Sequence, residues 1–315
     1  MIRQRIEVAL FAVGMVLLPL LPRRCVVLLA HGLGSLGYYC SRKQRVLARA
    51  NIQLAFGKQL SRREQARIAE QSFRTFALLL LDLFWFRRST ASRVERYVVL
   101  DESFENLFRT RPAIIVTAHF GNWEALGLAI AREGYPVVSV AAPLANPFVD
   151  RALNRLRTST GQRIIPKEGA VRRLLRELRG GAGTAMLLDQ NTLPRDGGVF
   201  VPFFGLPVPI SRAAVRLAAR SGASIVPVFS VPQPDGSYRG YALAPIPVVR
   251  DVDEDEMTAR LAKMMEQQIR ENPGHWLWMY RRWKLVPEGG DREQFPWYAR
   301  PIRDYELPVD GGRAG

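Results

Sequence analysis

The feature that most constrains the fold is an alternation of short apolar segments with amphipathic ones, which begins beyond residue 95. The apolar segments are rich in β-branched residues, and we predict strands at Pro112–Ala118, Pro136–Ala141, Thr184–Leu188 and Ser224–Phe229. The stretches between them have helical spacing, and we predict helices at Trp123–Glu133, Phe148–Ser159, Gly169–Arg179 and Arg212–Arg220. Because strands separated by helices form βαβ units, we predict an α/β fold with a largely parallel central sheet flanked by helices.

The N-terminal region predicts contact with a membrane. As a helix rising about 1.5 Å per residue, the apolar segment Val8–Leu21 would cover roughly 21 Å, less than a hydrocarbon core of about 30 Å. A signal peptide is the alternative, but Pro22, Arg23 and Arg24 replace the small residues of a cleavage site. With the second apolar stretch, Cys25–Cys40, we expect a retained anchor made of a helix or helical hairpin that enters one leaflet.

A long helix is predicted to follow this region. Ser61 and Glu64 have the spacing of a capping box, and the helix runs on into the apolar segment Phe76–Phe86, which suits either a buried core or a membrane-facing surface. We therefore divide the chain into a membrane anchor at 1–40, a helical region at 41–95, an α/β domain at 96–287 and a peripheral tail at 288–315.

The strongly basic composition predicts anionic partners. A net charge of +16 suits nucleic acid, an anionic membrane, or an acidic carrier protein together with a phosphorylated substrate. We predict no nucleic-acid binding, because the charge is not accompanied by a helix-turn-helix, ribonucleoprotein or zinc-finger pattern and the N-terminus is apolar. We also predict no metal site, because the two cysteines and three histidines lack a ligand spacing.

A histidine and a carboxylate stand where chemistry is expected. The first predicted strand delivers His119 to its carboxyl end, where open α/β sheets bind ligands, and Asn122 is placed to cap the following helix. Glu124 falls in the first helical turn, from which it could fold back towards the imidazole. We therefore predict His119 as a general base oriented by Glu124. The bare pattern His-x4-Glu is also compatible with a structural histidine.

The segment His119–Glu124, which reads His-Phe-Gly-Asn-Trp-Glu, closely resembles the signature of the lauroyl/myristoyl acyltransferases of lipid A biosynthesis, within the wider lysophospholipid acyltransferase group. Further segments are similar to other blocks of that family in the same order, namely Arg45–Ile52, Asn146-Pro147 with Arg157 and Gly161, Leu188–Gln190, Val201–Gly205 and His275–Lys284. The resemblance therefore extends over most of the chain.

The resemblance implies a membrane-associated acyltransferase in which His119 is the base and Glu124 its partner. The implied reaction moves a fatty acyl chain from acyl carrier protein, as co-substrate and with no further cofactor, to a hydroxyl of a phosphorylated lipid A precursor. The implied location is the cytoplasmic face of a bacterial inner membrane. Where many members have Arg-Pro before the Asn-Pro element, this chain has Ala142-Pro143. Another glycolipid, such as an acylated mannoside, or an aminolipid therefore stays open as the acceptor.

Several polar residues are candidates for substrate binding. Asp189 and Gln190 follow a predicted strand, where they could position the acceptor or cap the strand end. Arg281 and Arg282 are interleaved with aromatic residues, which suits a surface for headgroup phosphates or a solvated face over a structural core. We predict substrate contacts from Asn122, Arg157, Asp189, Gln190, Arg281 and Arg282.

Overall fold

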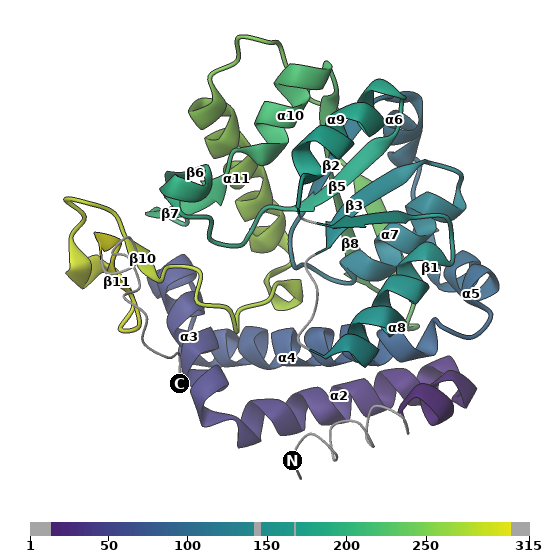
Figure 1. Ribbon diagram of the computed structural model, residues 1–315. Helices are drawn as coiled ribbons and strands as arrows, with labels where there is room; N and C mark the ends of the chain where they lie inside the picture. Colours follow the sequence, from purple (N-terminus) through teal and green to yellow (C-terminus); the bar gives the residue numbers. More distant parts are fainter. Residues whose placement is uncertain (1–13, 142–145, 167, 304–315) are drawn as a thin grey trace.

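The structure, a computed structural model, describes residues 14–141, 146–166 and 168–303 (Figure 1). Its α-helices are α2 (Arg23–Cys40), α3 (Arg42–Phe56), α4 (Arg62–Trp85), α5 (Thr90–Tyr97), α6 (Phe104–Arg109), α7 (Trp123–Arg132), α8 (Pro147–Thr158), α9 (Ala170–Arg179), α10 (Ala213–Ser221) and α11 (Glu254–Glu271). Its strands are β1 (Val98–Leu100), β2 (Ala113–Thr117), β3 (Val137–Ala141), β4 (Arg163–Pro166), β5 (Gly183–Leu187), β6 (Gly198–Phe203), β7 (Leu206–Ser211), β8 (Ser224–Pro232), β9 (Tyr238–Ala242), β10 (Leu285–Val286) and β11 (Arg300–Pro301).

The core of the molecule is a seven-stranded sheet with the order β1-β9-β8-β2-β5-β3-β4. Strands β8, β2, β5, β3 and β4 pair in parallel, whereas β9 pairs antiparallel with β8. Strand β2 is central and every one of its residues is buried, which explains its continuous run of β-branched and small side chains. The predicted α/β fold with a largely parallel sheet flanked by helices is confirmed.

The predicted strands and helices of this domain all form. The four predicted strands correspond to β2, β3, β5 and β8, and the four predicted helices to α7, α8, α9 and α10. The prediction missed the antiparallel β6–β7 hairpin and the long helix α11. In the hairpin, prolines and paired aromatic residues interrupt simple alternation, so the period of two is hard to recognise.

Helix α2 lies alongside α4, away from the central sheet (Figure 1). Its inward face is buried and consists of Val26, Ala30, Gly34 and Tyr38. At Gly34 the two helices approach so closely that an added Cβ would lie 2.4 Å from the Cα of Arg74. Across residues 14–141, 146–166 and 168–303, no helix combines the length and the apolarity needed to cross a membrane. The predicted membrane segment Val8–Leu21 lies partly outside the described residues.

Helix α4 connects the N-terminal helices to the sheet. Ser61 and Glu64 form the predicted capping box, in which each side chain accepts a hydrogen bond from the other residue's backbone amide. Within the apolar run, Leu78, Leu79 and Trp85 are buried, so this part of the helix is mainly core. The helical region predicted at 41–95 is therefore packed onto the α/β domain.

The described part of the predicted tail, residues 288–303, is not peripheral. Strand β11 pairs in parallel with β10, and Phe295, Tyr298 and Ile302 are buried. The Tyr298 hydroxyl also donates a hydrogen bond to the side chain of Asn51 on α3. Single buried aromatic residues hold this segment in place. They do not recur with the spacing of a helix or a strand, so the sequence pattern does not predict their burial.

The close crossing of α2 and α4 predicts opposite effects for two glycines of one helix. Gly34→Ala should destabilise the protein, because the new methyl group meets the backbone of α4. Gly32→Ala should raise stability by up to about 1 kcal/mol, since an added Cβ at Gly32 meets nothing within 4 Å and alanine favours a helix. Thermal unfolding of both purified variants checks this; equal shifts would contradict the crossing.

Candidate active site

His119 lies directly after β2 and is bonded to a buried carboxylate. Its Nδ1 lies 2.7 Å from Oδ1 of Asp189, and its backbone amide donates to Oδ2 of the same residue over 2.9 Å. The indole of Trp276 donates the third hydrogen bond of this carboxylate, also to Oδ2, over 2.8 Å. Asp189 is almost completely buried, whereas the His119 side chain keeps 14% of its surface exposed. The carboxylate thus holds the imidazole from its inner side and leaves the outer side accessible.

This arrangement selects the tautomer of His119. An ionised carboxylate only accepts hydrogen bonds, so Nδ1 carries the proton and Nε2 carries the lone pair. Burial lowers the pKa of His119, but the charge and hydrogen bond of Asp189 and the charge of Glu124 outweigh burial, so the pKa is raised. Gln190 places its amide nitrogen 3.3 Å from Nε2. The site therefore presents a basic nitrogen whose orientation is fixed.

Glu124 has a different partner from the one predicted. Both of its oxygens accept hydrogen bonds from Arg157 on α8, at 2.8 and 2.5 Å, and Trp123 donates to one of them. The first turn of α7 directs this carboxylate towards α8, so the carboxylate hydrogen-bonded to His119 is that of Asp189. The structure corrects the predicted orienting role of Glu124, which acts on the imidazole through its charge.

Asn122 is a buried cap at the start of α7. Its Oδ1 accepts a hydrogen bond from the backbone amide of Ala125, which confirms the predicted N-cap, and the residue is 1% exposed. The structure thus gives Asn122 a structural role in the turn, and its predicted substrate contact stays a prediction. Gly121 precedes it with a φ of +58°, and an added Cβ there would lie 1.8 Å from the carbonyl oxygen of Ser230. Only glycine fits this turn between His119 and α7.

The remaining predicted substrate residues divide into buried and accessible ones. Asp189 accepts hydrogen bonds from His119 and Trp276 and lies behind the imidazole, on the side away from its accessible surface. Arg282 is fully buried and donates through Nη1 to the side chain of Asn191 over 2.6 Å. Burial lowers its pKa to about 10.

The buried position of Arg282 corrects the prediction that it belongs to a surface for lipid phosphates. Three tryptophans of the same block, Trp276, Trp278 and Trp283, are buried with it, so the aromatic residues form core packing. The side chain of Arg282 supports the loop that follows Asp189. Arg157, Gln190 and Arg281 keep accessible surface, and their substrate contacts stay predictions.

The contact between His119 and Asp189 follows from strand order. Each residue comes shortly after a strand, and those strands, β2 and β5, are parallel neighbours in the sheet. The carboxyl ends of parallel neighbours meet at one edge. Sequence reasoning placed both residues at strand ends but missed their pairing, because it did not predict which strands are adjacent. It also missed the contribution of Trp276, for which the sequence offers no signal.

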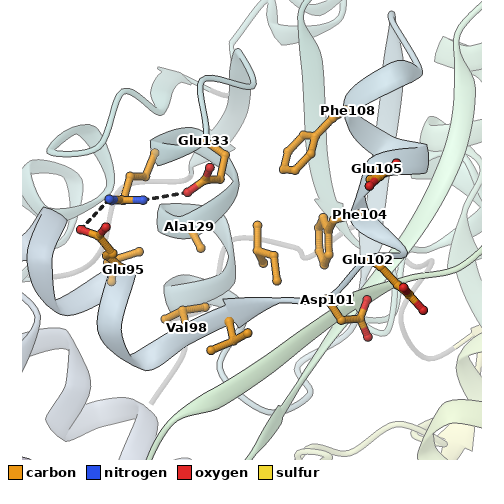
Figure 2. Close-up of a pocket in the computed structure, with 13 residues that line it drawn as sticks. Glu95, Val98, Asp101, Glu102, Phe104, Glu105, Phe108, Ala129 and Glu133 are labelled. Carbon is orange, nitrogen blue, oxygen red and sulfur yellow. Dashed lines mark hydrogen bonds and ion pairs between the residues drawn. The ribbon is translucent and has the colours of Figure 1, made fainter.

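A cavity of about 560 Å³ lies elsewhere in the domain (Figure 2). It is lined by Ala129 and Glu133 near the end of α7, together with residues of α5, β1 and α6. Because His119 adjoins the start of α7, this cavity and the His119 site lie at opposite ends of that helix, which is about 15 Å long. The cavity is separate from the candidate active site.

Comparison with known proteins identifies the family of this α/β domain and its His119–Asp189 pair. Residues 2–285 match the family model described as bacterial lipid A biosynthesis acyltransferase, and the chain therefore belongs to this acyltransferase family. It is 27% identical to the lipid A biosynthesis palmitoleoyltransferase of Escherichia coli K12 and 26% identical to the lauroyltransferase of the same organism. Each match covers 85% of this chain and 88% of the relative.

A second group of relatives has another name. The chain is 26% identical to the phosphatidylinositol mannoside acyltransferase of Mycolicibacterium smegmatis, over 58% of this chain and 60% of the relative. The resemblance noted from the motifs is thus confirmed at the level of the family.

Replacing Asp189 should affect both the rate and its pH dependence. In Asp189→Asn, kcat should fall by about 10²–10⁴-fold, because the amide does not hold the Nδ1–H tautomer. The unmodified base loses activity as the pH falls through its raised pKa. Without the carboxylate charge, burial dominates and lowers that pKa, so the acidic limb of kcat/KM against pH should move to lower pH. Glu133→Gln, on the surface of the same domain, serves as control, and an unmoved acidic limb would refute the assignment.

Proposed function

We propose that this protein transfers a fatty acyl chain from acyl carrier protein to a hydroxyl of a lipid A precursor. The observation that carries the proposal is His119, whose Nδ1 is held by a buried carboxylate while Nε2 is left as a base at the carboxyl edge of a parallel sheet. Family membership supplies the acyl-transfer chemistry, and the two relatives from Escherichia coli act in lipid A biosynthesis by name.

The proposed reaction is a direct transfer without an acyl-enzyme intermediate. Nε2 of His119 takes the proton of the acceptor hydroxyl as its oxygen attacks the thioester carbonyl carbon. The resulting tetrahedral intermediate collapses with cleavage of the carbon–sulfur bond, and the thiol of the carrier leaves with the proton from His119. Asp189 stabilises the imidazolium that forms between these steps. Glu124 adds a second negative charge nearby and keeps Arg157 beside the site.

A transfer assay on purified protein tests this function. With acyl carrier protein carrying a labelled chain and a lipid A precursor as acceptor, the unmodified protein should form acylated product that mass spectrometry detects. His119→Ala should lower kcat by at least about 10³-fold while the protein stays folded, because the base is lost. His31→Ala, which removes a histidine exposed on α2, should keep the full rate. Near-normal turnover of His119→Ala would refute the mechanism.

A second acceptor class is favoured by a specific observation. Ala142 stands where many family members have arginine, and one group of relatives acts on phosphatidylinositol mannoside by name. Residues 142–145 lie outside the described residues, so the argument rests on the sequence. Incubation with labelled acyl donor and total membrane lipid separates the alternatives, because an acylated mannoside or aminolipid would differ in mass from an acylated disaccharide.

We further propose that α2 holds the protein on the cytoplasmic face of a bacterial inner membrane. The outward face of this helix is apolar, and its leucines include Leu28 and Leu36 with 70% and 58% of their surface exposed. Leu29 and Leu33 lie on the same face at helical spacing. Arg24 is exposed near the start of the helix, where it suits lipid phosphate. An exposed apolar helix face with a neighbouring cation is typical of a helix that lies in the membrane interface.

Charged substitutions on the outward face should release the protein from lipid. Leu28→Asp with Leu36→Asp should lower binding to phosphatidylglycerol vesicles by at least about tenfold in a flotation assay, because two carboxylates would enter the interface. Val249→Asp is the matched control, since Val249 is 68% exposed in a loop remote from α2 in sequence. Unchanged flotation of the double variant would show that α2 is not the membrane contact.

A further inference from the structure

A buried carboxylate on α4 joins four separate parts of the chain. Asp82 accepts hydrogen bonds from both terminal nitrogens of Arg23, at the start of α2. Its Oδ2 also accepts from the side-chain amide of Asn122 over 2.9 Å and from the hydroxyl of Tyr238 over 2.6 Å. All four residues are at most 4% exposed, so these contacts are shielded from water.

The contact with Asn122 reaches the candidate active site. The amide of this side chain donates to Asp82, while its oxygen accepts from the backbone of Ala125 and so starts α7. Its backbone amide donates to the hydroxyl of Ser230 over 3.0 Å. Asn122 is three residues beyond His119 and two before Glu124. The turn that carries both groups is therefore fixed from two directions, by α4 and by β8.

We propose that Asp82 is a positioning residue of the active site, which holds the His119–Glu124 segment through Asn122 and links it to Arg23 on the helix with the exposed apolar face. This inference rests on the proposed acyl-transfer function. Asp82 does not touch the reacting atoms. It influences the position of His119 through Asn122, the N-cap of α7. Hydrogen bonds run from Arg23 on α2 to Asp82 on α4 and from Asp82 to Asn122 in the turn after His119. Figure 1 shows α4 between α2 and the α/β domain.

The directions of these hydrogen bonds make an exchange of side chains informative. In Asp82→Asn, the new amide group faces either the amide of Asn122 or the guanidinium of Arg23, so two donors meet in both orientations. In Asn122→Asp, the cap of α7 is kept but two carboxylates meet. When both substitutions are combined, the amide introduced at position 82 donates to the carboxylate introduced at position 122. Its oxygen then accepts from Nη1 of Arg23, and the Tyr238 hydroxyl can turn to accept from the same amide. The contact between positions 82 and 122 is thereby restored, while Nη2 of Arg23 loses its acceptor.

The experiment compares the two single variants with the exchanged double variant in the full-length protein. Each single variant should lower kcat by at least about tenfold with KM for the acyl donor within about threefold, because the base is displaced while both substituted residues are buried and leave the protein surface unchanged. The double variant should recover kcat to within about threefold of the unmodified protein. Trp85→Phe serves as the control, because it removes a hydrogen bond from α4 to the backbone of Leu21 and no contact with Asp82 or Asn122, so it should lower the melting temperature and keep kcat.

Three outcomes would overturn the inference. The single variants could retain kcat, the exchange could restore the melting temperature without kcat, or Trp85→Phe could lose as much activity as stability. ¹⁵N NMR of the imidazole rings provides a readout independent of turnover: the His119 signals should shift in each single variant and return in the double variant. If the unmodified protein transfers no acyl chain, the proposed function fails, and the ring signals alone decide whether Asp82 positions the histidine.

Discussion

The parallel pairing of β2 with β5 is the constraint on which the candidate active site depends. It brings His119 and Asp189, which are 70 residues apart in the chain, to one edge of the sheet. This contact fixes the orientation of the imidazole. It also buries the carboxylate of Asp189, whose side chain keeps only 3% of its surface exposed. Burial alone would raise the pKa of Asp189, but the charge of His119 and the hydrogen bonds from His119 and Trp276 hold it below its usual range.

Local signals in the sequence were sufficient for four strands of the sheet and for the place of His119 at the end of one of them. The strand before His119 is a continuous apolar run, and the cap at Asn122 needs only its own residue and the three that follow. The partner of His119 was not predictable in this way, because strand order is a property of the whole fold. Glu124 was the nearer carboxylate in sequence and therefore the natural candidate, but the first turn of α7 directs it to Arg157.

The arginine content of the sequence likewise does not show which arginines lie on the surface. The excess of arginine indicated anionic partners, yet Arg23 and Arg282 are internal residues that the composition counts with the surface ones. Arg23 forms an ion pair with Asp82, and Arg282 interacts with an asparagine side chain and a backbone carbonyl. Burying a guanidinium without a carboxylate partner costs free energy of folding. Arg282 nevertheless supports the loop after Asp189, a structural role that the composition does not indicate.

The two faces of α2 are subject to different limits on sequence change. On the inner face, Gly34 lies against the backbone of α4 and Arg23 is tied to Asp82, so substitutions there disturb the domain itself. On the outer face, the exposed positions of Leu28 and Leu36 have room for any side chain of similar hydrophobicity. As the proposed membrane contact, the outer face of α2 is free to change in composition with the lipid it meets, whereas a change on the inner face also requires a change in α4.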